Sequence, residues 1–412
     1  MLRFPEFQNA KGWEFVTLQD ASVPVAERVG QKKLTPVSIS AGIGFVPQAE
    51  KFGRDISGNQ YQLYTLVRDG DFVYNKGNSL KFPEGCIYLL QGWGQVAAPN
   101  VFICFRLKEG YSNGFFQNFF EANAHGKQLK KHITSGARSN GLLNISKESF
   151  FGVAIPTPSS AEQQKIADCL SSVDELIAAQ ARKLDALKTH KKGLMQQLFP
   201  REGETQPRLR FPEFQDAPDW DVKRLEDLSK RGSGHTPRKS IPEYYDGGIK
   251  WVSLADSKRL DFGLISNTKI EISKQGIKNS SAVLHPAGSV LVSRDAGVGK
   301  SAVMEVPMAV SQHFIVWTCN LLLLSNWFLY YLLQEMKPVF ERMATGSTIK
   351  TIGLPFFKGL RVSVPHLPEQ HRIADCLTAL DDLIAAQTQK LEAFKTHKKG
   401  LMQQLFPYPA EE

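Results

Sequence analysis

The stretch EQQKIADCLSSVDELIAAQARKLDALKTHKKGLMQQLFP occupies residues 162–200 and returns, without a gap, at residues 369–407. The two copies lie 207 positions apart and are identical at 29 of their 39 positions. A repeat that is so long and present only twice does not indicate a solenoid, and it is typical of duplication and fusion. The sequence therefore predicts a chain built from two related halves.

The repeated stretch predicts a long helix with one apolar face. Its apolar residues step by fours and threes, the spacing of a heptad seam that keeps one stripe turned toward a partner helix. A helix of about 37 residues is roughly 55 Å long. Ser160 and Gln163 are placed to form a capping box at the start of the first copy, and Pro200 ends it. The predicted seam residues are Ile166, Leu170, Val173, Ile177, Leu184, Leu187, Leu194, Leu198, Ile373, Leu377, Leu380, Ile384, Leu391, Phe394, Leu401 and Leu405.

Polar residues interrupt this seam at two equivalent pairs of positions: Gln180 and Lys191, and Gln387 and Lys398. One interpretation is that they set the register of a helix pair at some cost in stability. The other interpretation is that they face a third helix supplied by a partner. The basic run KTHKKG, which ends each copy, is interpreted as a solvated face, and contact with backbone phosphate is left open.

The composition predicts a soluble globular protein. The chain of 412 residues is 42% hydrophobic and 22% charged, with no signal peptide and no apolar run long enough to cross a bilayer. Its five cysteines form no CxxC, which argues against a zinc site or a disulfide framework and for the reducing cytoplasm. A net charge of +9 is compatible with nucleic acid as a partner without establishing it.

A second, shorter repeat marks the start of each half. RFPEFQNAKGWEFVTLQD at residues 3–20 returns as RFPEFQDAPDWDVKRLED at residues 210–227, again 207 positions later. Each half therefore has a short aromatic leading segment, a globular region and a long helix. The predicted divisions are a first domain (1–155), a central helix (156–200), a linker (201–209), a second domain (210–364), a C-terminal helix (365–407) and a tail (408–412).

The two globular regions have dissimilar sequences but the same order of predicted elements. Each region of roughly 130 residues is interpreted as an α/β module, with short strand-like runs separated by Gly, Asn and Pro turns. Strands are predicted at 62–66, 71–74, 86–89, 101–107, 250–254, 289–293 and 314–319, and helices at 115–132 and 326–342. A shared framework with dissimilar modules suggests one scaffold that presents two specificities.

No catalytic set emerges from the motifs. The sequence GVGKS at residues 297–301 resembles the end of a phosphate-binding P-loop, but the position five residues before Gly299 is Arg294 and not glycine. The chain also lacks HExxH, a nucleophile elbow, a Rossmann glycine turn and an amino-methyltransferase motif, and its nine histidines show no metal spacing. We therefore predict a non-enzymatic chain without a metal or cofactor of its own.

Basic and small polar residues gather in the two modules and are our candidates for contact with DNA. Lys and Arg neutralise phosphates, whereas Arg, Asn and Ser or Thr read base edges. The alternative is an ordinary solvated basic face. The residues that follow two strand-like runs, Lys76 and Arg294, match in context. The candidates are Lys76, Lys127, Lys130, Lys131, Arg138, Ser139, Asn140, Arg238, Arg294, Asp295, Lys300, Arg342, Ser347, Thr348 and Lys350.

The sequences LPEQHRIADCL and KTHKKGLMQQLFP, the paired RFPEFQ and GHTPRKSIPEYYDGGIKWV together resemble the specificity subunit of type I restriction-modification enzymes over essentially the whole chain. The resemblance implies two α/β target-recognition domains in inverted, pseudo-two-fold arrangement, separated by two long antiparallel coiled-coil helices. It implies reading of a two-part, asymmetric sequence in double-stranded DNA, one part per domain.

The same resemblance implies partners that carry the chemistry. Two methyltransferase subunits would hold S-adenosylmethionine and methylate adenines, and restriction subunits would add translocation and cleavage driven by ATP with Mg. Two alternatives remain open. One is a coiled-coil interaction protein that never touches DNA. The other is a single-chain methyltransferase or nuclease, against which the missing motifs speak.

Overall fold

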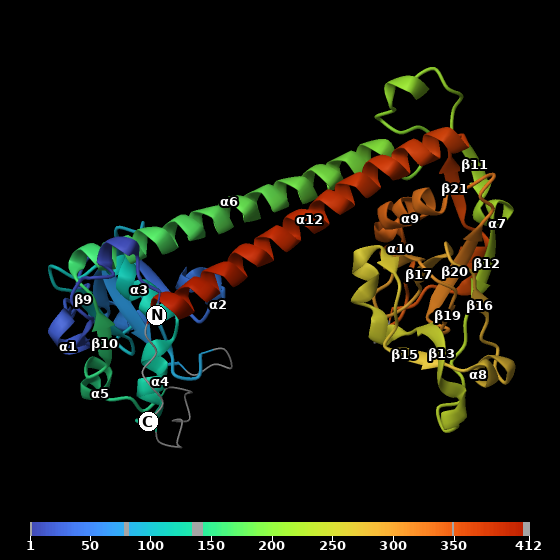
Figure 1. Cartoon of the computed structure of the whole chain (residues 1–412). Helices are drawn as coiled ribbons and strands as arrows, with labels where there is room; N and C mark the ends of the chain where they lie inside the picture. The colour runs from blue at the N-terminus through green and yellow to red at the C-terminus, as the bar shows by residue number, and fades with distance from the viewer. Residues whose placement is uncertain (1, 78–81, 134–142, 348–349, 407–412) are drawn as a thin grey trace. The chain divides into compact units, whose positions relative to one another are not determined.

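A computed structural model of the chain describes residues 2–77, 82–133, 143–347 and 350–406. The chain divides into two compact units, a first unit of residues 1–181 with 389–412 and a second unit of residues 182–388. Each unit combines one globular module with parts of both long helices (Figure 1). The units cut each long helix in two, whereas the predicted divisions keep each helix whole, so those divisions stay predictions.

The repeated stretches form the two long helices that the heptad pattern predicts. They are α6 (Ser160–Leu198) and α12 (Leu367–Leu405), each of 39 residues. The predicted capping box at Ser160 is wrong, because α6 is capped one residue earlier. The Ser159 hydroxyl accepts a hydrogen bond from the backbone N–H of Glu162 at 3.4 Å, which satisfies one of the free N–H groups of the first turn.

Within each unit the start of one long helix packs beside the end of the other, so the two helices run in opposite directions there. Leu405 of α12 shares a hydrophobic core with Ile166 of α6, and Leu198 of α6 shares another core with Ile373 of α12. All sixteen predicted seam residues are described, and none is exposed. Buried are Ile166, Leu170, Val173, Leu184, Leu198, Ile373, Leu377, Leu391 and Leu405; half-buried are Ile177, Leu187, Leu194, Leu380, Ile384, Phe394 and Leu401.

Each leading segment binds the start of a long helix through a buried ion pair. Arg3 donates to both carboxylate oxygens of Glu162 at 2.8 and 2.7 Å, and the indole N–H of Trp13 donates to the same carboxylate at 3.3 Å. The second leading segment contacts Glu369 in the same way, at 3.0, 2.6 and 3.3 Å. The two carboxylates are only 1% and 2% exposed. Two parallel hydrogen bonds between arginine and carboxylate fix geometry as well as charge, which explains why both repeats occur together.

The residue directly before each leading segment contacts the end of the other long helix. The Leu2 N–H donates to the Gln404 carbonyl at 2.7 Å, and the Leu209 N–H donates to the Gln197 carbonyl at 3.0 Å. In each unit, therefore, one short segment holds the start of one helix and the end of the other. The N-terminal segment completes the first unit in the same way that the segment after the linker completes the second.

The described part of the module of the first unit contains two four-stranded sheets and one two-stranded sheet. Its strands are β1 (Glu14–Thr17), β2 (Ser22–Pro24), β3 (Thr35–Ser40), β4 (Gly44–Pro47), β5 (Thr65–Arg68), β6 (Asp71–Asn75), β7 (Cys86–Leu89), β8 (Gln95–Ala98), β9 (Ile103–Leu107) and β10 (Ala154–Thr157). Its helices are α1 (Leu18–Ala21), α2 (Gln48–Phe52), α3 (Asn113–Glu121), α4 (Ala124–Lys130) and α5 (Lys147–Phe151). Among the described residues the sheet orders are β2-β9-β6-β7 and β4-β3-β8-β5, and β1 pairs with β10 next to the start of α6.

The module of the second unit is built in the same way. Its strands are β11 (Asp221–Arg224), β12 (Ser229–Ser233), β13 (Tyr245–Val252), β14 (Leu264–Ile265), β15 (Ile270–Ile272), β16 (Leu284–His285), β17 (Val290–Ser293), β18 (Ser301–Met304), β19 (Met308–Val310), β20 (Phe314–Cys319) and β21 (Arg361–Val364). Its helices are α7 (Leu225–Leu228), α8 (Lys274–Lys278), α9 (Asn326–Glu335), α10 (Lys337–Met343) and α11 (Leu354–Lys358). The sheet orders are β12-β20-β17-β18-β14 and β15-β13-β19-β16, and β11 pairs with β21.

The two modules share one topology although their sequences differ. The order β2-β9-β6-β7 corresponds to β12-β20-β17-β18, and β4-β3-β8-β5 corresponds to β15-β13-β19-β16. The parallel pair of β3 with β8 has its counterpart in the parallel pair of β13 with β19. The second module adds β14, which pairs in parallel with β18. The predicted agreement in element order is thus confirmed at the level of strand pairing.

Three local predictions are wrong for identifiable reasons. The helix predicted at 115–132 is two helices, α3 and α4, because Asn123 between them adopts a left-handed backbone with φ of 56°. The helix predicted at 326–342 is also two helices, because Pro338 in the first turn of α10 has no N–H with which to continue α9. The strand predicted at 62–66 begins only at β5, after a 3-10 turn.

The cores of both units are rich in aromatic side chains. In the first unit the ring of Phe105 stacks on Phe72 at 5.2 Å between centroids and meets Phe120 edge-on at 6.0 Å. In the second unit Trp317 meets Phe357 edge-on at 5.9 Å. Offset-stacked and edge-on pairs are the favourable arrangements of aromatic rings. No helix in the described part of the chain is long and apolar enough to span a membrane.

Candidate nucleic-acid interface

In the second unit, Arg294 joins three segments, two of which carry predicted DNA-contacting residues. It directly follows β17, and its N–H donates to the His313 carbonyl at 2.9 Å. Its carbonyl accepts from the Ile352 N–H at 2.8 Å, and its Nε donates back to the Ile352 carbonyl at 3.1 Å. The turn after β17, the turn before β20 and the segment after α10 therefore meet at one end of the sheet.

The turn between β17 and β18 is the segment that resembles a P-loop. Gly297 and Gly299 have φ of 101° and 84°, a left-handed backbone that favours glycine. Lys300 donates to the Ser257 carbonyl at 3.1 Å and pairs with Asp261 at 2.8 Å. A P-loop leads from a strand into a helix, whereas this turn leads into strand β18. The glycines here close a hairpin.

The segment after α10 forms a narrow loop beside this hairpin. Thr345 and Thr351 exchange two backbone hydrogen bonds at 3.1 and 2.8 Å and so close the loop at its base. Ser347 and Lys350 lie within it and are exposed. The candidate Thr348 lies outside the described residues. The loop thus presents a hydroxyl and an ammonium group to solvent next to Arg294.

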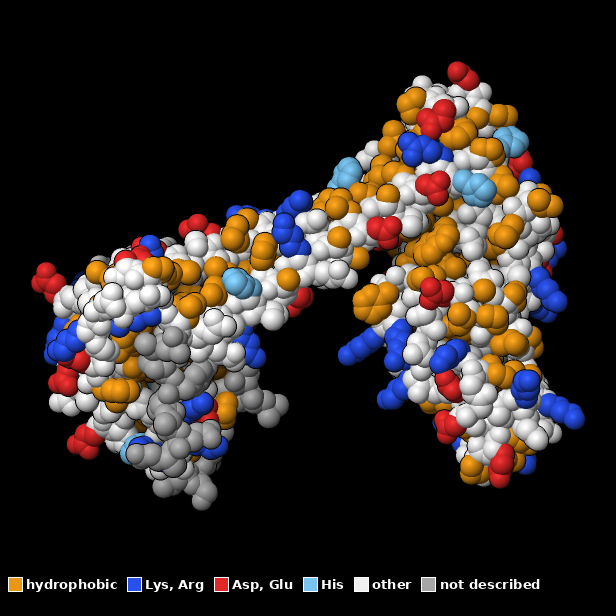
Figure 2. Space-filling view, viewed as in Figure 1, with side chains coloured by type: hydrophobic (Ala, Val, Ile, Leu, Met, Phe, Trp, Pro, Cys, Tyr) orange, Lys and Arg blue, Asp and Glu red, His pale blue; other side chains and the backbone are white. Residues whose placement is uncertain are grey.

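Two further candidates of the second unit are exposed. Arg238 lies in the loop after β12, and Arg342 on α10 forms an ion pair with Glu202 of the linker. Exposed ion pairs contribute little to stability, so Arg342 loses little when it exchanges this carboxylate for a phosphate. Figure 2 shows further Lys and Arg side chains projecting from this module around β13, β15 and α8.

In the first unit the candidates lie on the corresponding elements. Lys127 and Lys130 of α4 and the following Lys131 are exposed, and Lys76 is half-buried directly after β6. Outside the described residues lie Arg138, Ser139 and Asn140.

The structure confirms the predicted match between the turns at Lys76 and Arg294. Each residue directly follows the strand that occupies the same place in its sheet, β6 or β17. The Lys76 carbonyl accepts from the Leu143 N–H at 2.9 Å, as the Arg294 carbonyl accepts from Ile352. Leu143 and Ile352 hence lie at equivalent places of the two modules.

Sequence reasoning missed a cleft beside the second sheet of the second module. It is lined by side chains that include Lys239, Tyr245 and Trp251 together with the turn before β20. The Tyr245 hydroxyl donates to the Pro237 carbonyl at 2.7 Å, and the Trp251 indole donates to the His235 carbonyl at 3.1 Å. These bonds hold the loop that carries Arg238 over the sheet. The signal in the sequence was the aromatic residues that follow the basic PRK tripeptide.

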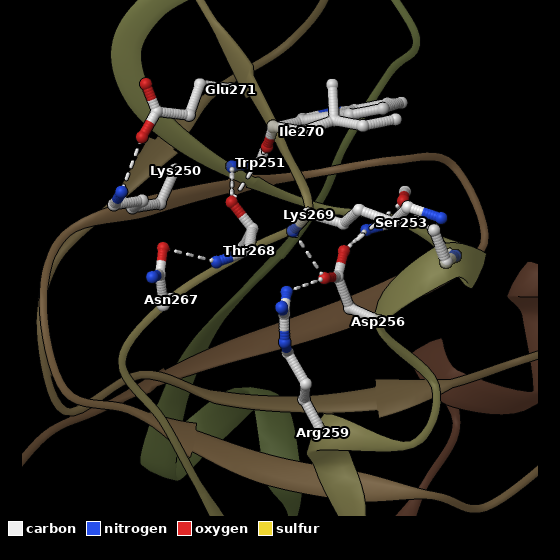
Figure 3. Close-up of polar contacts among 11 residues, drawn as sticks. Lys250, Trp251, Ser253, Asp256, Arg259, Asn267, Thr268, Lys269, Ile270 and Glu271 are labelled. Atoms are coloured by element: carbon white, nitrogen blue, oxygen red, sulfur yellow. Dashed lines mark hydrogen bonds and ion pairs between the residues drawn. The ribbon is translucent and has the colours of Figure 1, made fainter. Parts of the chain in front are cut away.

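A buried carboxylate shapes one wall of this cleft. Asp256 is fully buried, and it accepts hydrogen bonds from the N–H of Ser253 at 3.1 Å, the N–H of Lys269 at 2.7 Å and the guanidinium of Arg259 at 2.8 Å (Figure 3). A buried charge needs such partners to offset its lost hydration. Asp256 therefore fixes the turn at Ser253, which lines the cleft, and leaves the Arg259 side chain 45% exposed.

The polar seam lysines have partners within their own units. Lys191 lies 2.5 and 2.6 Å from the two oxygens of Asp381, and Lys398 lies 2.9 Å from Glu121 and 2.8 Å from Asp174. Burial lowers the pKa of Lys398, but its hydrogen bonds to Asp174 and Glu121 outweigh burial, and the pKa is raised above its usual value. Because these pairs link α6 to α12, the structure favours the register-setting interpretation over a third helix.

Three cysteines and one histidine have pKa values that make their side chains unreactive near neutral pH. Burial raises the pKa of Cys86 to about 11 and the pKa values of Cys104 and Cys319 to about 12. The thiolate is the nucleophilic form of cysteine, so these thiols are weak nucleophiles. Burial lowers the pKa of His125 to about 3, which keeps its ring neutral. Among the described residues, no group of three or more His, Cys, Asp or Glu side chains is placed to hold a metal.

Comparison with known families decides what these paired modules are. The type I restriction modification DNA specificity domain matches residues 65–189 and 218–395, one match in each half and together well over half of the chain. The chain belongs to this family. The match confirms the resemblance carried by the repeats. The first matched region runs from β5 into α6, and the second runs from just before β11 into α12.

Two curated relatives support the family assignment. The specificity subunit of type I restriction enzyme MjaIX of Methanocaldococcus jannaschii is 29% identical over 176 residues, 42% of this chain and 40% of that protein. The putative MjaX specificity subunit of the same organism is 26% identical over 279 residues, 67% of this chain and 63% of that protein. The chain thus spans between two fifths and two thirds of the length of these relatives.

A solved structure shows the same fold over the whole length. A chain from the structure described for complex assembly and conformational transition of the type I R-M system aligns with a TM-score of 0.62 and 20% identity. The alignment covers 98% of this chain and 99% of the other. The likeness extends across both modules and both long helices.

Proposed function

We propose that this chain is the DNA-specificity subunit of a type I restriction-modification complex and reads a two-part, asymmetric target, one part per module. The observation that carries the proposal is the shared strand topology of two modules with dissimilar sequences. A scaffold used twice presents its reading loops at equivalent places, while dissimilar loops make the two halves of the target different. Lysine and arginine on these loops supply contacts to phosphate.

The proposal gives α6 and α12 the role of a spacer. As a long antiparallel coiled coil they would separate the two modules in a pseudo-two-fold arrangement and set the length of the unread DNA between the half-sites. The ion pairs of Lys191 and Lys398 support this role, because they fix the register of the helix pair. A two-fold protein suits a duplex whose backbone has two-fold symmetry.

Catalysis then belongs to partner subunits. We expect two methyltransferase subunits, which hold S-adenosylmethionine and methylate adenine, and restriction subunits, which use ATP and Mg. The chain itself would bind DNA and scaffold these partners in the cytoplasm. The weakly nucleophilic buried thiols are consistent with this division of labour.

Exchange of one module tests the proposal. Residues 21–155 are replaced by the module of another family member, and methylated positions are mapped by sequencing genomic DNA from a host that carries the chain and its methyltransferase partners. One half of the two-part motif should change and the other should stay. The reciprocal exchange of residues 229–364 is the matched control and should change the opposite half. Changes in both halves from one exchange, or a motif without two parts, would overturn the proposal.

The spacer role has its own test. Seven residues are inserted at equivalent positions of both long helices, after Ala181 and after Thr388. A heptad keeps the seam facing its partner and adds about 10.5 Å, which is about three base pairs of DNA. The unread spacer should lengthen, whereas the same insertion in one helix alone should break assembly or distort the spacer. An unchanged spacer with intact methylation after the double insertion contradicts this role.

A further inference from the structure

Equivalent turns precede strands β9 and β20. In the first module the turn closes with the Phe102 N–H donating to the Pro99 carbonyl at 3.1 Å. In the second module the Phe314 N–H donates to the Ser311 carbonyl at 3.2 Å. Both turns enter the strand that pairs with β6 or β17, the strands that lead into the predicted DNA loops. The two turns therefore occupy the same place in the fold, beside the candidate interface.

The second residue of each turn carries a primary amide side chain. It is Asn100 in the first module and Gln312 in the second, and both are exposed. The flanking residues differ between the modules, so the shared amide does not follow from similar local sequence. The two modules thus place the same chemical group at the same exposed position, next to loops that carry basic residues.

A chain of hydrogen bonds orients the amide of Gln312. The Asp295 carboxylate lies 2.8 Å from His313 Nδ1, and Gln312 Nε2 lies 3.4 Å from His313 Nε2. The Thr236 hydroxyl donates to Gln312 Oε1 at 2.6 Å. When Asp295 accepts the proton on Nδ1, His313 Nε2 bears a lone pair and accepts from the Gln312 amide. The carboxylate therefore sets which way the amide faces.

The oriented amide keeps one donor and one acceptor for a ligand. An amide NH₂ has two hydrogens and its oxygen has two lone pairs, and the network uses one of each on Gln312. A donor beside an acceptor matches adenine, whose major-groove edge offers N7 as acceptor and N6 as donor. We propose that Gln312 and Asn100 are the specificity-determining residues that each read one adenine in the half-site of their own module.

The surroundings of both amides suit a DNA backbone. In the first module the cleft that includes Asn100 is also lined by Arg28, Lys76 and Lys147. In the second module the cleft that includes Gln312 is also lined by Lys239, Tyr245 and Trp251. Cations that bind phosphate position a duplex, and an amide in the same cleft is placed to read a base edge.

Two buried polar atoms without hydrogen-bond partners lie in or beside the turn that carries Gln312. Among the described residues, Asp295 Oδ1 and Ser311 Oγ are buried without a hydrogen-bond partner. Buried polar atoms are normally paired, and exceptions are typical of functional sites. Ser311 belongs to the turn that carries Gln312, and Asp295 contacts this turn through His313. The turn and its neighbour therefore contain polar atoms that the fold itself leaves unpaired.

The inference rests on the proposed function and is tested by changing the chemistry of the amides. Gln312→Glu keeps the size of the side chain but replaces its donor by an acceptor, which suits the N4 amino group of cytosine. Methylated motifs are mapped in a host that carries the variant and its methyltransferase partners. Preference for adenine should fall by about 10-fold or more at one base pair of one half-site, since one good amide–base pair gives that discrimination. Asn100→Asp should do the same in the other half-site.

Control variants distinguish a failure of this inference from a failure of the proposed function. Gln215→Glu makes the same change at an exposed position of the second leading segment and should leave the motif intact. Thr236→Val keeps Gln312 but removes the hydroxyl that donates to its amide oxygen. Preference for adenine should therefore fall at the same base pair. Unchanged half-sites in Gln312→Glu and Thr236→Val, with methylation continuing, overturn this inference alone. A native chain that gives no two-part motif instead overturns the proposed function.

Discussion

The buried carboxylate of Glu369 allows one unit to be weakened without the other. It accepts two hydrogen bonds from Arg210, at 3.0 and 2.6 Å, and one from Trp220, at 3.3 Å. The substitution Glu369→Gln keeps the shape of the side chain but removes its charge. The amide oxygen can still accept one guanidinium bond, whereas the new NH₂ group faces donors, so the charge of Arg210 is left unpaired.

The expected loss of unfolding free energy follows from the burial of the ion pair. Removing one partner of a buried ion pair costs about 3–5 kcal/mol. Arg210 is 12% exposed and keeps hydrogen bonds to the carbonyls of Ala217 and Pro218, at 2.9 and 3.3 Å, so we expect the lower end, about 3 kcal/mol. The second unit spans the 207 residues from 182 to 388. For a domain of this size the loss lowers Tm by about 6–12 °C.

Calorimetry of the full chain, with hydrogen exchange to assign each transition, measures the effect. Glu369→Gln should lower the transition of the second unit, and Glu162→Gln should lower that of the first. Glu213→Gln removes a partner of Arg372 from a pair whose side chains are 47% and 48% exposed, and it should cost less than about 1 kcal/mol. The reasoning is refuted if Glu369→Gln costs no more than Glu213→Gln, or if both units respond equally.

Two further predictions concern a helix position and pH. Gly400 lies inside α12, and a Cβ added there would meet no described atom within 4 Å. Gly400→Ala should therefore raise the free energy of unfolding by about 1 kcal/mol through helix propensity alone, and a loss of stability in thermal unfolding would contradict this. His125 is fully buried, and burial lowers its pKa to about 3 from an ordinary 6.5. Between these pH values the unfolded chain binds a proton that the folded chain does not, so stability of the first unit should fall as pH falls below 6.5, by about 1.4 kcal/mol per pH unit. In urea unfolding at pH 7, 6 and 5, His125→Met should flatten this dependence and His132→Gln, at an exposed position, should not; equal slopes in the native chain and His125→Met would count against the reasoning.

The long helices were predictable because their signal is local and strong. A seam repeated over 39 residues leaves few alternatives to helix, and the predicted and observed ends differ by four residues or fewer. Shorter elements were less predictable. Asn123 and Pro338 broke two predicted helices, since one backbone conformation or one missing N–H outweighs the periodicity of a short stretch.

The candidate interface was predictable only in part. The basic and glycine-rich turns in the sequence pointed to Arg294 and Lys76 as candidates. The structure shows that both turns follow equivalent strands. The amides of Asn100 and Gln312 carried no signal in the sequence, because a single Asn or Gln in a turn is ordinary. The importance of Gln312 depends on segments far apart in the chain, which bring the His313 imidazole and the Thr236 hydroxyl within hydrogen-bonding distance of its amide and the Asp295 carboxylate within hydrogen-bonding distance of that imidazole.

By itself the sequence determined the duplication, the two long amphipathic helices and the family, because these depend on patterns that extend over dozens of residues. Only the tertiary structure decided that the dissimilar modules share one strand topology, that Lys191 and Lys398 find their partners on the opposite helix, and which turns meet. The physical reason is that strand pairing, burial and hydrogen-bond geometry join residues separated by many positions, and no local pattern encodes which of them will touch.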